Sequence, residues 1–269
     1  MLLELTSSNA SVDKGDFFQT TERLEKVIQG GLKRNLHRED LPWESFDAST
    51  LDDDVKGALA FLVAQLTHFE AISPQNLSLL SASTPVQSLR NAYATQVHDE
   101  VAHGNMLLRY QTQCLGASPA VHASTKLAAK SGLLVQLDPL AGSVGVMAGI
   151  EFFAVEVLGA LKEKVQEPLL LSMIAHIEKD EHRHKAIAVE SARVLSQTSL
   201  TKGVVGVAKH KALRKCVELF FRHVTCPTFH KRVAPLELVP KELYEKSLDE
   251  MSDTFRRELG SDGRWTGVV

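Results

Sequence analysis

Apolar residues recur at intervals of three and four along most of this 269-residue chain, which is the spacing of one buried helix face. No stretch alternates apolar and polar residues between turn residues, as a half-buried strand would. The pattern therefore predicts an all-α protein. The expected helices cover residues 17–36, 49–80, 84–116, 138–164 and 167–197, with two or three more beyond residue 200.

Capping residues mark several of these helix starts. Ser49 and Thr50 precede three consecutive aspartates, and hydroxyl caps followed by first-turn acids favour a helix start. Thr84 followed by Pro85 predicts the next start, with the hydroxyl at the N-cap and proline at the first helical position. We expect Gly116 to end that helix.

Two of the predicted helices carry ionisable residues on their apolar faces. These are Glu100 and His103 in one helix, and Glu181 and His184 in the other. Residues three apart lie on one side of a helix, so each Glu-x-x-His unit presents an oxygen and a nitrogen to one metal ion. A buried carboxylate without a partner is strongly disfavoured, which calls for a partner such as a metal.

Single glutamates occupy the same kind of position on two other long helices. The interval from Glu70 to Glu100 is 30 residues, and the interval from Glu151 to Glu181 is also 30 residues. The triplet Glu70, Glu100 and His103 therefore recurs 81 residues later as Glu151, Glu181 and His184. A proline lies near the middle of each interval, where a helical hairpin would turn. Both hairpins therefore bring their acids to one level. We expect Pro74 to kink the first helix without ending it.

Segments 99–103 (DEVAH) and 180–184 (DEHRH) resemble the paired D-E-x-x-H motifs of the di-iron oxygenase superfamily, over roughly residues 55–195. The resemblance implies a ferritin-like four-helix bundle with additional N- and C-terminal helices, in which residues 104–150 form the long crossover. It implies that Glu100 or Glu181 bridges the two metals. Asp99 and Asp180 resemble outer acids that hold the ligand imidazoles, and Arg183 resembles an arginine that pairs with them. The implied metal ligands are Glu70, Glu100, His103, Glu151, Glu181 and His184.

The sequence departs from one branch of that superfamily. The arylamine N-oxygenases carry a further histidine one turn before the last glutamate, where this chain has Ile177. N-oxygenation of that kind is therefore less well supported. Of the flanking residues His176 and Glu178, neither shares the ligand stripe, and Glu178 is the better candidate for an extra carboxylate.

Aromatic residues near the predicted ligands have an ordinary packing interpretation. Tyr93 and Tyr110 lie on the ligand stripe of their helix, and we expect both to pack in the core with a satisfied hydroxyl rather than to carry a radical. Phe152 and Phe153, beside Glu151, are expected to pack the bundle rather than to line a pocket.

The predicted ligands favour an oxygen-activating enzyme with two iron ions, manganese being compatible, and dioxygen as co-substrate. Hydroxylation or N-oxygenation of a small organic biosynthetic substrate is the first choice. Desaturation or C–C cleavage of an acyl or amino-acid-like chain is the alternative. A ferritin-like iron-handling or peroxide-scavenging protein and a manganese-iron oxidase use the same ligands. An oxygenase also implies an external electron donor, either a reductase or a ferredoxin.

Composition and charge narrow the partners and the setting. The net charge of −3 gives no reason to expect nucleic-acid binding. Residues 202–232 are basic and are suited to an acidic carrier protein, although a solvated face is the simpler interpretation. Three separated cysteines and no signal-like segment favour a cytoplasmic setting without membrane association. We expect one domain, 1–269, with a metal-binding core at 52–198 and an extension at 200–269; a homodimer is compatible.

Overall fold

The computed structural model describes residues 22–34, 41–123, 125–126, 148–197 and 226–259. All regular structure in these ranges is helical, which confirms the all-α prediction. Four long helices form the centre and three others pack outside them. The central helices are α3 (Asp53–Ser83), α4 (Gln87–Arg109), α7 (Ala148–Lys164) and α8 (Pro168–Gln197), and the outer ones are α2 (Glu22–Arg34), α10 (Cys226–Val233) and α11 (Pro240–Leu259). Short 3₁₀ segments are η1 (Trp43–Ser45), η2 (Ala48–Thr50) and η8 (Ala234–Leu236), and η3 (Tyr110–Cys114) is a π-helical turn.

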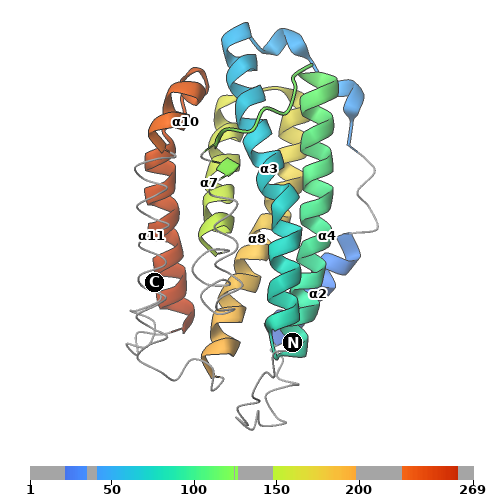
Figure 1. The fold of residues 1–269 in the computed structure, drawn as a ribbon, viewed down its shortest axis with the longest axis vertical. Coiled ribbons are helices and arrows are strands. Elements are labelled where there is room, and N and C mark those ends of the chain that lie inside the picture. The colour runs from blue at the N-terminus through green and yellow to red at the C-terminus, as the bar shows by residue number, and fades with distance from the viewer. Residues whose placement is uncertain (1–21, 35–40, 124, 127–147, 198–225, 260–269) are drawn as a thin grey trace, which may run out of the picture.

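The four central helices are arranged as two antiparallel hairpins (Figure 1). Helix α3 packs along α4, and α7 packs along α8. Helix α2 contacts both α4 and α8, while α11 lies on the outer side of α7. The predicted ferritin-like four-helix bundle with additional terminal helices is therefore confirmed. The proposed division at residues 198–200 stays a prediction.

Two hydrophobic clusters lie at opposite ends of the bundle. One includes Leu80, Leu89 and Phe152, and the other includes Leu59, Leu107 and further side chains of α7 and α8. In α3, α4 and α8 the ionisable residues predicted as ligands lie between members of the two clusters, and Glu151 of α7 lies next to Phe152, close to the boundary between them. Burying a leucine contributes about 1.5–3 kcal/mol, so the two clusters offset the cost of placing charged groups between them.

The start of α3 is capped by a residue other than those expected. Asp52 is the N-cap, and its carboxylate accepts a hydrogen bond from the Val55 backbone N–H at 2.8 Å. Ser49 and Thr50, the expected caps, belong instead to the 3₁₀ turn η2, which Asp47 caps. A carboxylate next to the first turn both accepts the hydrogen bond and complements the helix dipole.

The predicted start of α4 at Thr84 and Pro85 is wrong. Thr84 ends the preceding helix, because its backbone N–H donates to the Leu80 carbonyl at 3.0 Å. Helix α4 begins at Gln87 after Val86, which makes no side-chain cap. Thr84 is buried in the short hairpin connection, where its N–H closes α3 and its hydroxyl has no hydrogen-bond partner and so does not cap α4.

The other predicted boundaries are mostly confirmed. Helix α3 continues through Pro74, and Gly116, with a φ of 62°, follows the π-helical turn that ends the α4 hairpin arm. Helix α7 ends at Lys164 and helix α8 begins at Pro168, as expected. The predicted helix start near 138, the ends of the first predicted helix, and most of the basic segment 202–232 lie outside the described residues.

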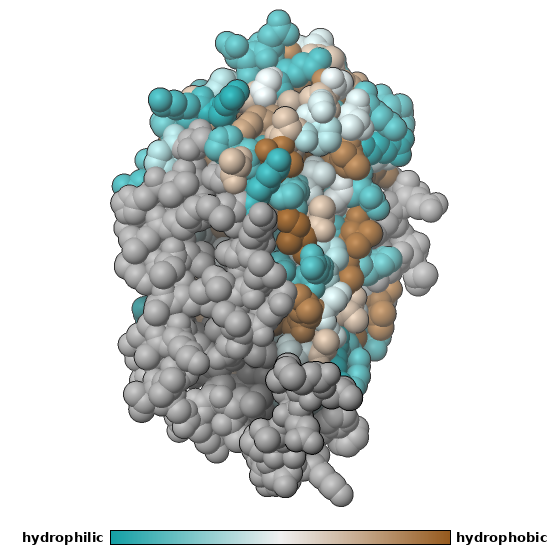
Figure 2. Space-filling model, in the orientation of Figure 1, coloured by the Kyte–Doolittle hydropathy of each residue, from teal (hydrophilic) through white to brown (hydrophobic). Residues whose placement is uncertain are grey.

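Helix α3 is the one described helix that is long and apolar enough to cross a membrane by length and composition alone. A helix from the core of a bundle passes the same test, and α3 packs along α4 in this way. Figure 2 shows one face of the molecule, on which hydrophobic residues stand between hydrophilic ones in the coloured part. The large exposed apolar side chains of the described residues are Leu32, Val101 and Leu108.

Candidate metal centre

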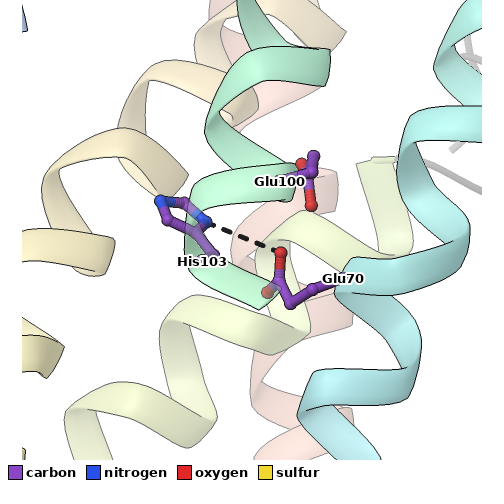
Figure 3. Close-up of side chains that lie close together, drawn as sticks. All are labelled: Glu70, Glu100 and His103. Carbon is purple, nitrogen blue, oxygen red and sulfur yellow. Dashed lines mark ion pairs between the residues drawn. The ribbon is translucent and has the colours of Figure 1, made fainter. Parts of the chain in front are cut away.

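The structure brings the six predicted ligands to one level of the bundle. Helices α3 and α7 supply one glutamate each, and α4 and α8 supply one Glu-x-x-His turn each. Figure 3 shows Glu70 of α3 facing Glu100 and His103 of α4. The side chain of Glu70 is 12% exposed, and those of the other five residues are 0–4% exposed.

The ligand atoms form two groups that share one residue. Glu70, Glu100 and His103 each place one atom within 4.8 Å of the others, and Glu100, Glu151 and His184 do the same. The two imidazole rings lie 6.0 Å apart between their centroids. Two neighbouring metal positions with Glu100 between them fit this arrangement.

Glu181 also lies between the two histidines. Its Oε1 is 3.3 Å from Nδ1 of His103, and its Oε2 is 3.4 Å from Nδ1 of His184. Each carboxylate oxygen therefore faces a different imidazole, which is the geometry that a bridging carboxylate needs. Both bridging candidates from the sequence are thus placed between the two groups.

The outer aspartates hold the imidazoles crosswise, each from the opposite helix pair. Asp180 of α8 lies 3.3 Å from Nε2 of His103 on α4, and Asp99 of α4 lies 3.2 Å from Nε2 of His184 on α8. Arg183 forms ion pairs with both aspartates and donates to the Thr95 hydroxyl at 3.2 Å. With each Nε2 held by a carboxylate, each Nδ1 is directed toward the centre.

Several buried atoms at this centre have no hydrogen-bond partner. They are Nδ1 of His103, Nδ1 of His184, Oε2 of Glu70 and Oε2 of Glu181. The two nitrogens lie 3.2–3.6 Å from carboxylate oxygens of the centre. Unsatisfied buried ionisable groups are costly, and a cation would satisfy all four atoms together. Four ionised glutamates balance the charge of two divalent cations. A set of oxygens and imidazole nitrogens without thiolates suits iron or manganese.

The carboxylates of the centre have shifted pKa values. Burial raises the pKa of Glu100 well above its usual range, and the charges of Glu70 and Glu151 raise it further. Burial, with the charge of Glu181, raises the pKa of Glu151 to about 8. Burial alone would also raise the pKa of Glu181, but the two histidines hold it well below its usual range.

The pKa values of the two imidazoles are raised, although burial by itself would lower them. Burial by itself would lower the pKa of His103, but the carboxylates of Asp180, Glu181 and Glu70 outweigh it and raise that pKa well above its usual value. His184 behaves in the same way because of Glu181 and its other carboxylate neighbours. Without a metal, positive charge on the two imidazoles would therefore offset part of the negative charge of the clustered acids.

Gln96 is a polar neighbour of the centre that the sequence interpretation missed. It is 2% exposed, and its Nε2 donates to Glu151 Oε1 at 2.8 Å and to Glu100 Oε1 at 3.3 Å. It lies three residues after Tyr93 and four before Glu100, which are both stripe positions. That helical spacing was the signal that could have identified it.

The candidates for a seventh ligand lie outside the cluster. Ile177 packs in an apolar cluster, and Glu178 forms an ion pair with Lys162 at 3.0 Å. Neither Glu178 nor His176 belongs to the two groups of ligand atoms found among the described residues. The structure therefore gives no support to an extra carboxylate from Glu178.

The aromatic residues behave as expected. The Tyr93 hydroxyl donates to Ser191 at 2.8 Å, and the Tyr110 hydroxyl donates to Glu167 at 3.0 Å, so both tyrosines are buried with satisfied hydroxyls. Phe152 packs against Phe255, and the Phe153 ring meets Tyr244 edge to face. Core packing is confirmed for all four predicted residues.

Comparison with known proteins identifies structural relatives only. No family model matches the sequence, and no curated protein matches it. An R2-like ligand-binding oxidase with an aerobically reconstituted Mn/Fe cofactor matches with a TM-score of 0.62 and 14% identity, over 87% of this chain and 92% of that chain. A variant of such an oxidase with an aerobically reconstituted Fe/Fe cofactor matches with a TM-score of 0.61 and 15% identity, over 93% and 94%. At this identity the likeness establishes the fold.

Proposed function

We propose that this chain is a dimetal oxidase or oxygenase, which binds two iron ions, or manganese and iron, and uses dioxygen to oxidise a small organic substrate. One observation carries the proposal: two Glu-x-x-His turns and two single glutamates meet inside one bundle, with unpartnered ligand atoms facing a common centre. Matched proteins of the same fold are oxidases with Mn/Fe or Fe/Fe cofactors, which supports the assignment.

Each part of the ligand set has a distinct role. Glu70 and His103 would hold one ion, and Glu151 and His184 would hold the other. Glu100 and Glu181 would contact both, since each lies within reach of both groups. The bound metals would supply the electrons that reduce dioxygen, which protein side chains do not provide.

The surrounding residues keep this chemistry ordered and dry. Asp180 and Asp99 hold the imidazoles in one tautomer and orientation, with Nδ1 free for a metal. Arg183 balances the charge of these two aspartates. The hydrophobic clusters on either side restrict water and strengthen electrostatic interactions within the centre.

Hydroxylation of a small organic molecule is the reaction we favour. Ile177 occupies the position of the extra histidine of arylamine N-oxygenases, so N-oxygenation ranks below hydroxylation. Desaturation and C–C cleavage need the same six ligands, and the shape of the substrate pocket decides among them. We propose that a reductase or ferredoxin supplies electrons and that the basic segment 202–232 docks an acidic partner.

Anaerobic loading with ferrous iron tests the proposal. We expect about two irons per chain, an optical change on exposure to oxygen, and faster oxygen uptake with an oxidisable substrate. His184→Ala should lose about one iron and the optical change. His182→Ala, an exposed histidine on the same helix, is the matched control and should retain both.

Two outcomes would contradict the proposal. Unchanged iron content and an unchanged spectrum in His184→Ala would remove this residue from the site. Many irons per chain, taken up without any substrate dependence, would instead identify an iron-handling protein.

A further inference from the structure

We propose that Gln96 is a positioning residue that holds Glu151 so that a single carboxylate oxygen, Oε2, faces the His184 side of the metal centre. The assignment rests on the proposed dimetal function and adds a specific geometry to it. Gln96 lies on α4, one helical turn before Glu100, and is 2% exposed. It reaches across the bundle to α7, with 2.8 Å between its Nε2 and Oε1 of Glu151.

The chemistry of the partners determines which end of the amide faces them. When metal binding keeps both carboxylates ionised, they only accept hydrogen bonds, so the amide nitrogen of Gln96, and not its oxygen, faces Glu151 and Glu100. The NH₂ group of Gln96 has two hydrogens, and the two contacts of 2.8 and 3.3 Å use both of them. Gln96 thereby links Glu151, which belongs to one group of ligand atoms, to Glu100, which belongs to both groups.

The hydrogen bond from Gln96 gives the two carboxylate oxygens of Glu151 different neighbours. Oε1 is held by Gln96, while Oε2 lies 3.5 Å from Nδ1 of His184. A carboxylate held in this way would bind a metal through one oxygen and would not chelate it. Gln96 would thereby keep the second oxygen of Glu151 from filling a coordination position that dioxygen or substrate could use.

The His103 side lacks this restraint in the part of the chain that the structure describes. No hydrogen bond from a side-chain amide reaches Glu70 there, and its Oε2 is buried without a hydrogen-bond partner. Glu70 and Glu151 have matching positions in the two sequence triplets, yet among the described residues a glutamine holds Glu151 and none holds Glu70. Gln96 therefore makes the two metal positions chemically unequal.

Gln96→Leu, compared with Gln65→Leu, tests this role. Gln65 is also a buried glutamine of the bundle, but its hydrogen-bond partners are Phe61, Ala120, His122 and Thr125, and none of its hydrogen bonds involves the six ligands. Binding would be measured with Mn²⁺ alone, using the electron paramagnetic resonance signal of the free ion. We expect Gln96→Leu to weaken one of two sites about 10–100-fold and Gln65→Leu to leave both affinities unchanged.

Infrared difference spectra of Mn²⁺ loading give a readout that a loss of stability would not produce. The separation between the antisymmetric and symmetric carboxylate stretches is larger for one-oxygen binding than for chelation. We expect this separation to narrow for one carboxylate band in Gln96→Leu. Gln96→Asn, which is too short to reach Glu151, should narrow it too and provides a second variant if the leucine variant does not fold.

The outcomes separate the two proposals. Fewer than two metal sites in the unmodified protein, both with Mn²⁺ and with ferrous iron loaded anaerobically, would overturn the proposed dimetal function. Two sites whose affinities and infrared bands are unchanged in the Gln96 variants would leave that function intact and overturn the role of Gln96. Narrowing in the Gln96 variants and not in Gln65→Leu supports it.

Discussion

Each histidine of this centre is held by an aspartate from the other helical hairpin. His103 of α4 is held by Asp180 of α8, and His184 of α8 is held by Asp99 of α4. In the proposed metal centre, each D-E-x-x-H motif would therefore supply a histidine to one metal position and the outer acid for the other. As a consequence, changing one aspartate should affect the metal position of the other motif's histidine.

Asp180→Ala should weaken metal binding at the His103 side about 10–100-fold, because the imidazole loses the carboxylate that orients it. The measurement is Mn²⁺ titration of the purified variant. Asp253→Ala, which removes an exposed carboxylate from α11, is the control and should bind as the unmodified protein does. Equal affinities in the two variants would show that Asp180 does not orient His103.

At the scale of elements, α2 covers the arginine behind the metal centre. A Cβ atom at Gly31 would lie 2.7 Å from Nη1 of Arg183 and 3.2 Å from Cβ of Thr95. The absence of a side chain at Gly31 therefore allows α2 to pack closely over Arg183. Gly30, one residue earlier, leaves an ordinary 3.9 Å to Cδ of the same arginine.

These two glycines make a matched pair of variants. Gly31→Ala should destabilise the protein by about 1–3 kcal/mol, because Arg183 is held by two aspartates and has little room to move. Gly30→Ala should be neutral or stabilising by up to about 1 kcal/mol, since alanine is the better helix former. Denaturant unfolding measures both, and similar stabilities would contradict the close packing of α2.

Helix α8 begins at a buried carboxylate. Glu167 accepts hydrogen bonds from the backbone N–H groups of Leu169 and Leu170, from the N–H of Asp47, and from the Tyr110 hydroxyl. One side chain thus caps α8 and connects it to η3, which follows α4, and to the turn before α3. Because Glu167 is fully buried, no water replaces these bonds when the carboxylate is removed.

Glu167→Ala should lower the free energy of unfolding by about 2–4 kcal/mol, since it removes a helix cap and leaves buried donors unsatisfied. Chemical denaturation monitored by circular dichroism measures this change. Tyr110→Phe removes only one of the four bonds and should cost less, about 0.5–1.5 kcal/mol. A smaller loss in Glu167→Ala than in Tyr110→Phe would contradict the capping role.

The end of α11 is held on the bundle by a carboxylate that responds to pH. A hydrogen bond from Arg23 of α2 is the main reason why the pKa of Glu258 lies below its usual value, and Arg257 contributes. Arg193 of α8 also pairs with Glu258, and Glu190 lies beside both Arg193 and Arg23. A lowered pKa stabilises the fold above the unfolded value of 4.5, and this contribution is lost as pH falls below it.

Glu258→Gln should therefore cost less than about 1 kcal/mol at pH 7 and almost nothing at pH 3, because the groups are partly exposed. Unfolding of both proteins at the two pH values measures the difference. Raised salt should also reduce it. A cost that stays constant with pH would assign the effect to something other than the charge of Glu258.

At the scale of the whole molecule, the ionisable layer separates two hydrophobic clusters. The layer holds four glutamates, two histidines and the outer acids, and the burial and mutual repulsion of its glutamates oppose folding when no metal is bound. The four central helices all contribute to this layer. Metal binding should therefore stabilise the bundle as a unit.

Loading with Mn²⁺ at about 100 times its Kd should stabilise the fold by about 2.7 kcal/mol for each site. For a chain of this size, that predicts a rise in Tm of about 5–10 °C for one site and more for two. Thermal unfolding with and without Mn²⁺ measures the shift. His184→Ala should show a smaller rise, and an equal rise in both proteins would place the bound ions elsewhere.

The sequence alone predicted the all-α class, the pairing of helices and the convergence of six ionisable residues. Helical periodicity determines which residues share a face, and equal intervals determine their level, so Glu70 and Glu151 were found without coordinates. The tyrosines and the beginning of α8 followed from the same local rules. The start of α4 did not, because Thr84 had two possible roles and burial in the hairpin decided between them.

Only the tertiary structure decided which groups meet across the bundle. The crosswise pairing of aspartates with histidines, the position of Glu181 between both imidazoles, and the reach of Gln96 to Glu151 depend on how far each helix is rotated and offset against its neighbours. Those quantities arise from the packing of many side chains, and they have no local signature in the chain. The sequence by itself therefore determined the composition of the centre, while packing determined its connections and its asymmetry.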